Sequence, residues 1–347
     1  MKNKEKKKWT ILIYADGNNE MEEVIYKSIE DCIGVGINKD INVVIQIGIL
    51  SSGVKRYYLN SSEPIVLQDL SKTNMADPNN LYNFVSFGTK EFPAHHYMLI
   101  LSGHGADFIG GLTDTSLEDN YIMGIPEMVK AIGLGSIHSR SIIDILILDM
   151  CFMNSIEILY ELTQYNESIK SMITYTNFAP YSGLNYNILI RSMGENLNVN
   201  DMDLFIKHII NNLNFELTAY KLDKLQLELI KKQFSHLAFD YLNNKGGNEN
   251  PINLVKSDNI NEINSLIESI IIYSKTKFNG INSSINIICH DISKLIGFYH
   301  KLGFSKNNYW TNLLYNNLEG INSSPINRVK VRTADSSTAL IHYILKF

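Results

Sequence analysis

The hydrophobic pattern in the first half of the chain alternates between short apolar runs and stretches with helical spacing. The apolar runs lie at residues 9–14, 42–49, 97–102, 142–148 and 171–175. Runs this short and this rich in β-branched residues are typical of strands buried on both faces. Helical spacing occupies residues 21–32, 80–90, 126–132 and 154–162. Strands that alternate with helices in this way predict an α/β fold with a mainly parallel central sheet.

The pattern changes after about residue 187. Helical periodicity recurs at 202–213, 220–242 and 260–274, and a polar stretch rich in Gly and Asn lies at 243–251. Antiparallel strands are expected at 329–332 and 338–345. We therefore divide the chain into a basic N-terminal tail (1–8), an αβα domain (9–200) and a smaller α/β C-terminal region (201–347).

Composition and charge are those of an ordinary globular protein. The chain has 347 residues, of which 45% are hydrophobic and 19% charged, and its formal net charge is −5. Its lysines are scattered and form no basic stripe of the kind that binds nucleic acid. No apolar run reaches the roughly 18 residues of a membrane span. We expect neither nucleic acid nor a membrane as a partner.

The lysine run at residues 2–8 has the charge of a signal-peptide start. The apolar stretch behind it, residues 9–14, breaks at Ala15, Asp16 and Gly17. A secretory signal has an apolar segment of about 7 to 15 residues and a small-residue cleavage site. We therefore expect a cytoplasmic protein, with secretion left open as the alternative.

The three cysteines, Cys32, Cys151 and Cys289, are far apart and form no CxxC pair. An odd number without close spacing predicts neither a disulfide framework nor a structural zinc site, so we expect no metal ligands among them. A single reactive thiol is compatible with this spacing.

Two strand ends carry candidate chemistry. His104 follows one apolar strand and is flanked by glycines, and Cys151 follows the next such strand. The carboxyl ends of parallel strands meet at one edge of a sheet, where an imidazole can take a proton from a thiol. The amides of Gly105 and Cys151 could then bind an oxyanion, and the helix expected from residue 154 would favour the thiolate. The alternatives are a Cys that only packs and a His that only fills a turn.

These segments resemble the clostripain family of cysteine peptidases, peptidase family C11, within the caspase-like clan. The resemblance spans about residues 10–190 and rests on four blocks in order: 9–14 with Asn18, Asn19 and Glu22; 102–105 with Gly110 and Gly111; 148–153 with Ile156 and Glu157; and Pro180, Gly183 and Tyr186. It implies a caspase-like catalytic domain with His104 as general base or acid. It also implies that Cys151 is the nucleophile that forms an acyl-enzyme.

The resemblance further implies a preference for Arg or Lys before the scissile bond, held by acidic groups of the S1 pocket. Asp149 falls on the family's pocket acid, and its alternative role is to cap the following helix. Where relatives have a Ser-Glu-like pair before Pro180, this chain has Thr176 and Asn177. The missing charge would weaken a guanidinium contact by about 1 to 3 kcal/mol. Asn177 could equally be an ordinary loop residue.

Relatives are often made as zymogens cut between the two catalytic blocks. In this chain that interval contains Lys130 and Arg140. Arg140 lies in a loop-like stretch at 135–141, whereas Lys130 lies in an expected helix. We therefore expect self-cleavage after Arg140 in preference to Lys130. An ordinary exposed loop is the alternative.

Some relatives hold calcium, and Asp114, Glu118 and Asp119 are the acidic candidates here, although their spacing is not that of a regular calcium loop. We expect no required cofactor, with calcium as an option. The sequence thus predicts a cysteine endopeptidase that acts on polypeptides as a monomer, or as two chains once processed. The alternative is a latent or inactive peptidase-like protein that works as a regulatory binding module.

Overall fold

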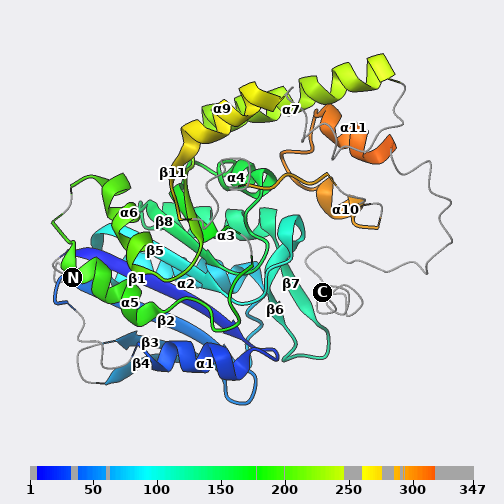
Figure 1. Cartoon of the computed structure of the whole chain (residues 1–347). Helices are drawn as coiled ribbons and strands as arrows, with labels where there is room; N and C mark the ends of the chain where they lie inside the picture. The colour runs from blue at the N-terminus through cyan, green and yellow to red at the C-terminus, as the bar shows by residue number, and fades with distance from the viewer. Residues whose placement is uncertain are drawn as a thin grey trace.

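The structure is a computed structural model (Figure 1), and it describes residues 6–32, 38–59, 63–176, 178–198, 200–245, 260–275, 285–289, 292 and 294–316. The strands are β1 Lys7–Gly17, β2 Ile41–Ile49, β3 Gly53–Leu59, β4 Pro64–Ser71, β5 Ala94–Ser102, β6 Gly110–Asp114, β7 Tyr121–Gly124, β8 Ile143–Asp149, β9 Ile169–Tyr175, β10 Leu217–Lys221 and β11 Ile271–Lys275. The helices are α1 Glu22–Glu30, α2 Pro78–Glu91, α3 Ile125–His138, α4 Ile156–Leu162, α5 Tyr186–Glu195, α6 Met202–Asn212, α7 Lys224–Lys245, α9 Asn261–Ile270, α10 Ile296–Tyr299 and α11 Tyr309–Asn316, with a 3₁₀ turn η1 at Asp107–Ile109. The strands expected at 329–332 and 338–345 lie outside the described residues.

A nine-stranded sheet organises these elements, in the order β11-β10-β9-β8-β5-β1-β2-β3-β4. Strands β2, β1, β5, β8 and β9 are parallel to one another. Strands β3 and β4 extend one edge of the sheet, and β10 and β11 extend the other, with antiparallel pairing. The prediction of a mainly parallel sheet is confirmed. A small antiparallel pair, β6 and β7, stands apart from the main sheet.

Helices cover both faces of this sheet (Figure 1). Within β1, Leu12 and Tyr14 belong to the core that α2, α3 and α4 cover, whereas Ile11 and Ile13 belong to the core under α1, α5 and α6. Both sets of side chains are fully buried. Burial on both faces explains why the central strands have continuous apolar sequences instead of alternating ones.

In two of the ranges expected to be helical in the C-terminal region, some residues form a strand. The helix expected over 220–242 begins only at Lys224, because the preceding residues form β10. The helix expected over 260–274 ends at Ile270, where β11 begins. A short apolar run fits both a buried strand and a helical face. Pairing decides between them here, of β10 with β9 and of β11 with β10. The sheet therefore continues past residue 200, the point at which the sequence suggested a domain boundary.

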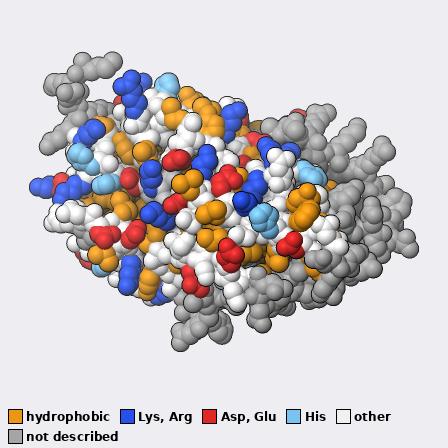
Figure 2. Space-filling model, turned by 90° about the horizontal axis from the view of Figure 1, so that it is seen from above, with side chains coloured by type: hydrophobic (Ala, Val, Ile, Leu, Met, Phe, Trp, Pro, Cys, Tyr) orange, Lys and Arg blue, Asp and Glu red, His pale blue; other side chains and the backbone are white. Residues whose placement is uncertain are grey.

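The described surface mixes side-chain types. On the face in Figure 2, Lys and Arg alternate with Asp, Glu and hydrophobic side chains, and no area is covered by one charge. Within the described ranges, no helix combines the length and the apolar character needed to cross a membrane.

Candidate active site

The candidate residues lie at one edge of the sheet because three neighbouring strands end there in register. Ala15 of β1 pairs with Ser102 of β5, and Ser102 pairs with Asp149 of β8. His104 and Cys151 each follow two residues after their strand's member of this row. The register thus brings the loops that carry them side by side, as the strand pattern predicts.

The loop after β5 and the loop after β8 touch through Gly105. A Cβ atom built on Gly105 would lie 2.1 Å from the carbonyl oxygen of Cys151 and 3.0 Å from its nitrogen. Contacts this short leave no room for a side chain, so the glycine allows the two backbones to meet. Among the described residues, neither the Gly105 N–H nor the Cys151 N–H donates to a protein acceptor. Both donors are free to bind an oxyanion.

The Cys151 thiol is half-buried. The acceptor found near its Sγ is the carbonyl oxygen of Ala179, at 4.0 Å. Burial raises the pKa of the thiol, the Ala179 backbone contact lowers it, and the charge of Asp149 raises it further. Helix α4 begins at Ile156, two residues after the expected start near residue 154. That its N-terminus favours the thiolate stays a prediction, set against the net rise in the thiol pKa.

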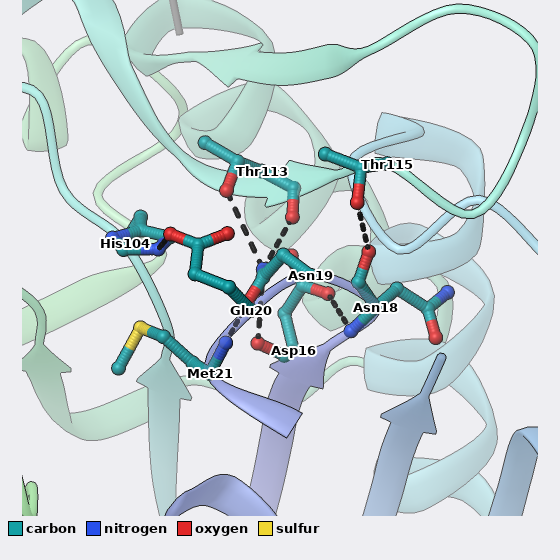
Figure 3. A network of polar contacts seen from close by, with 8 residues as sticks. All are labelled: Asp16, Asn18, Asn19, Glu20, Met21, His104, Thr113 and Thr115. Atoms are coloured by element: carbon teal, nitrogen blue, oxygen red, sulfur yellow. Dashed lines mark hydrogen bonds and ion pairs between the residues drawn. The ribbon is translucent and has the colours of Figure 1, made fainter. Parts of the chain in front are cut away.

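His104 binds a carboxylate that the sequence analysis did not single out. Its Nε2 lies 2.7 Å from Oε1 of Glu20 (Figure 3). The pKa of Glu20 is lowered, chiefly by this hydrogen bond. The sequence signal for this partner of His104 is an acidic residue soon after the end of β1. Because β1 lies directly beside β5, the residues that follow the two strands are neighbours.

Asp149 is buried and accepts hydrogen bonds from four neutral donors. Its oxygens accept from the hydroxyls of Ser102, Tyr175 and Tyr186 and from the backbone N–H of Leu184. It does not cap α4, whose N-cap residue is Ser155. Within the described part of the chain, no cationic side chain forms an ion pair with it.

Gly183 lies next to Asp149 and has a backbone conformation that other residues rarely adopt. Gly183 has a φ of +64°, and a Cβ built on it would lie 3.1 Å from Oδ2 of Asp149. A side chain at this position would be strained and would press on the carboxylate. Asn177, the second expected pocket residue, lies outside the described residues.

An aromatic pair flanks Cys151 on the solvent side. The rings of Phe152 and Phe178 meet edge to face with centroids 5.1 Å apart, and Phe178 is 70% exposed. Phe152 has a positive φ of 62°, which β-carbon-bearing residues rarely adopt. The residue after Cys151 is thus held in a strained turn at the candidate site.

The two expected cleavage positions lie away from this edge. Lys130 is exposed on α3, as expected. Arg140 is also exposed, but α3 continues to His138, so most of the expected loop at 135–141 is helical. Only the turn after the helix remains outside regular structure, and Arg140 has a φ of +55° within it.

The acidic residues considered for calcium are not gathered into a site. Asp114 is fully buried, and its oxygens accept from Asn18, Met75 and Ser116. Glu118 and Asp119 are exposed on the loop between β6 and β7. In the part of the chain that the structure describes, no three His, Cys, Asp or Glu side chains are grouped as metal ligands would be.

The chain as a whole matches a known family. A model of the clostripain family matches residues 13–324. An inactive zymogen C11 protease from Parabacteroides distasonis has a similar structure, with a TM-score of 0.65 and 16% identity over 88% of this chain and 99% of that one. A secreted C11 cysteine protease from Bacteroides thetaiotaomicron, solved with an irreversible peptide inhibitor, has a TM-score of 0.62 and 16% identity over 78% and 85%. Another from that organism, iotapain, has a TM-score of 0.64 and 13% identity over 90% and 100%. No match was found among curated proteins.

At these identities the solved structures show a shared fold, and the family match spans nearly the whole described chain. The protein belongs to the clostripain family, peptidase family C11, and is a cysteine peptidase.

Proposed function

We propose that this peptidase is an endopeptidase whose nucleophile is Cys151 and whose base is His104. The observation that carries the proposal is the close approach of Gly105 to the backbone of Cys151, with both N–H groups free. Two free donors beside a thiol are what the tetrahedral intermediate of amide hydrolysis requires. The half-buried imidazole of His104, which precedes Gly105, can supply the proton transfers.

The steps follow from these groups. His104 takes the Cys151 proton, and the sulfur attacks the peptide carbonyl carbon while the oxyanion accepts from Gly105 and Cys151 N–H. His104 then gives its proton to the leaving amine as the C–N bond breaks, which leaves an acyl-enzyme. A water molecule that His104 deprotonates hydrolyses the thioester and returns the free thiol. Since the thiol pKa is raised, proton transfer to His104 is an essential part of the attack.

The proposed preference is for Arg or Lys before the scissile bond. Asp149 supports it, because this buried carboxylate has only neutral hydrogen-bond donors around it. A substrate guanidinium or ammonium would supply the opposite charge that the described residues do not. Gly183, which has no side chain, lies next to this carboxylate: a Cβ built on it would lie 3.1 Å from Oδ2 of Asp149.

We also propose that cleavage after Arg140 activates the chain. Arg140 is exposed, follows the last turn of α3 and lies between His104 and Cys151 in sequence. Lys130 is the second choice, since its peptide bond lies within α3 and a helix must unwind before a protease can bind it. The steps above use no cofactor, and calcium is proposed only as an optional ligand.

The test compares the full chain with its Cys151→Ala variant on fluorogenic peptides ending in Arg, Lys, Gln or Leu. Each assay is run with added calcium and with a chelator. We expect hydrolysis of the Arg and Lys peptides by the wild type alone, with little dependence on calcium. Equal hydrolysis by wild type and Cys151→Ala would overturn the assignment of the nucleophile and leave the regulatory binding role as the better explanation.

A further inference from the structure

We infer that Glu20 is a positioning residue for His104, which fixes the ring nitrogen that faces the thiol of Cys151. This inference rests on the proposed dyad and deepens it. The contact that carries it is the 2.7 Å hydrogen bond between Glu20 Oε1 and His104 Nε2. The Glu20 side chain is 54% exposed and that of His104 is 21% exposed.

The chemistry of the two groups sets the tautomer. A carboxylate can only accept hydrogen bonds, so Nε2 of His104 must carry a hydrogen in this contact. In neutral His104 the unprotonated nitrogen is then Nδ1, which has no hydrogen-bond partner among the described residues. Nδ1 is the atom that accepts the Cys151 proton, and the imidazolium that results stays paired with Glu20.

The loop that carries Glu20 is anchored on both sides. The preceding residues Asn18 and Asn19 are buried, and Asn19 Nδ2 donates to the carbonyl of Thr113 at 2.6 Å. Asn19 Oδ1 accepts from the Met21 N–H at 2.9 Å, which fixes the backbone on the other side of Glu20. Figure 3 shows these contacts together with the His104–Glu20 pair.

His104 is anchored to β6, the strand that also anchors the loop of Glu20. Its carbonyl accepts from the N–H of Leu112 in β6 at 2.9 Å, and Thr113 of β6 holds Asn19. The N–H of Thr115 also donates to the Asn18 carbonyl at 2.9 Å. His104 and the loop that carries Glu20 both form hydrogen bonds to β6 or to the residues just after it. The backbone therefore sets the distance between them before any substrate binds.

The experiment uses the full chain with Glu20→Gln, Glu20→Asp and a control, Glu23→Gln, an exposed acid nearby on α1. Gln keeps the size but can bind either tautomer of His104, whereas Asp keeps the charge on a shorter side chain. We measure kcat and KM on an Arg peptide, and separately the rate at which iodoacetamide alkylates Cys151. Melting temperatures show that each variant is folded.

For Glu20→Gln we expect kcat to fall on the order of 10-fold to 100-fold while KM changes less than about twofold. Alkylation of Cys151 should slow in parallel, with Glu20→Asp intermediate and Glu23→Gln unchanged. Glu20→Gln activity equal to or above that of the wild type, or a change confined to KM, would overturn the inference. If the wild type hydrolyses no peptide, the proposed function fails, and the alkylation rates still decide the role of Glu20.

Discussion

The backbone of Gly105 lies against that of Cys151 so closely that a single methyl group would have to sit 2.1 Å from the Cys151 carbonyl oxygen. Backbone atoms cannot give way as a flexible side chain does. We therefore expect Gly105→Ala to displace one or both of the proposed oxyanion donors and to lower kcat/KM by about 100-fold or more. The measurement is peptide hydrolysis by folded variant protein.

The matched control is Gly297→Ala, because a Cβ at Gly297 meets nothing within 4 Å. It should keep wild-type activity. Activity of Gly105→Ala within threefold of the wild type would show that the two backbones can separate without loss of the oxyanion site.

Thiol labelling separates the three cysteines. Burial raises the pKa of Cys32 to about 12, whereas Cys151 is only half-buried and is proposed to be activated by His104. In a Cys289→Ser background we expect Cys151 to be alkylated at pH 7 at least about 100 times faster than Cys32. Peptide mass mapping gives both rates.

The same labelling tests the proton acceptor. Burial raises the pKa of Cys151, so without His104 the thiol stays protonated at neutral pH and its thiolate fraction increases as pH rises. His104→Ala should slow labelling by roughly 10-fold or more at pH 7 and recover it at higher pH. Equal rates in both proteins at pH 7 would mean that His104 does not activate the thiol.

Asp149 can be tested through selectivity. Loss of its charge in Asp149→Asn should lower the ratio of kcat/KM for Arg over Leu peptides by about 10-fold or more, since a charge-assisted contact contributes about 1.5 to 3 kcal/mol. Asp144→Asn, at the opposite end of the same strand, is the control. An equal loss for both peptides would indicate that Asp149 only holds the fold through Tyr175 and Tyr186.

The placement of His104 and Cys151 at one edge of the sheet was predictable from sequence because its signals are local. Apolar strands mark where the parallel sheet ends, and residues just beyond such ends share an edge. Glu20 and the two tyrosines that hold Asp149 were not predictable in this way. Each is brought to the site by a turn or by pairing between distant segments, which local periodicity does not encode. The same limit explains β10 and β11, whose sequences also suit a helix: β10 becomes a strand by pairing with β9, and β11 by pairing with β10.

Self-cleavage after Arg140 should produce a fragment that begins at Ser141. We expect it to appear slowly in the wild type, because the end of α3 at His138 must unwind first. Cys151→Ala and Arg140→Gln should remain intact, and Lys130→Gln should still be cut. N-terminal sequencing after prolonged incubation gives the result, and a wild-type sample that shows only its original start argues against activation at this position.

Glu157 of α4 and Asp107 of the 3₁₀ turn η1 form a pair of interacting carboxyl groups. Glu157 of α4 is fully buried, and its Oε1 accepts from Ile288 N–H at 3.0 Å and from the Tyr299 hydroxyl at 3.1 Å. Burial, and then the charge of Asp107, raise the pKa of Glu157 to about 8, and burial raises that of Asp107 to about 7. Glu157 therefore joins Ile288 and Tyr299 to α4 while its carboxyl group still holds a proton near neutral pH.

The sign of the pH dependence follows from linkage. Between the ordinary carboxyl pKa of about 4 and the raised values, the folded chain binds more protons than the unfolded chain. The free energy of unfolding is therefore highest at low pH and falls as the pH rises through this window to about 8. Glu157→Gln removes the larger share of this effect while its amide oxygen can still accept from Ile288 and Tyr299. We expect the melting temperature of the wild type to fall between pH 5 and pH 8 by roughly 2 to 5 °C more than that of Glu157→Gln. Glu268→Gln, on the exposed face of α9, should keep the wild-type slope. If the melting temperatures of the wild type and of Glu157→Gln fell by the same amount across this pH range, Glu157 would be ionised in the folded chain.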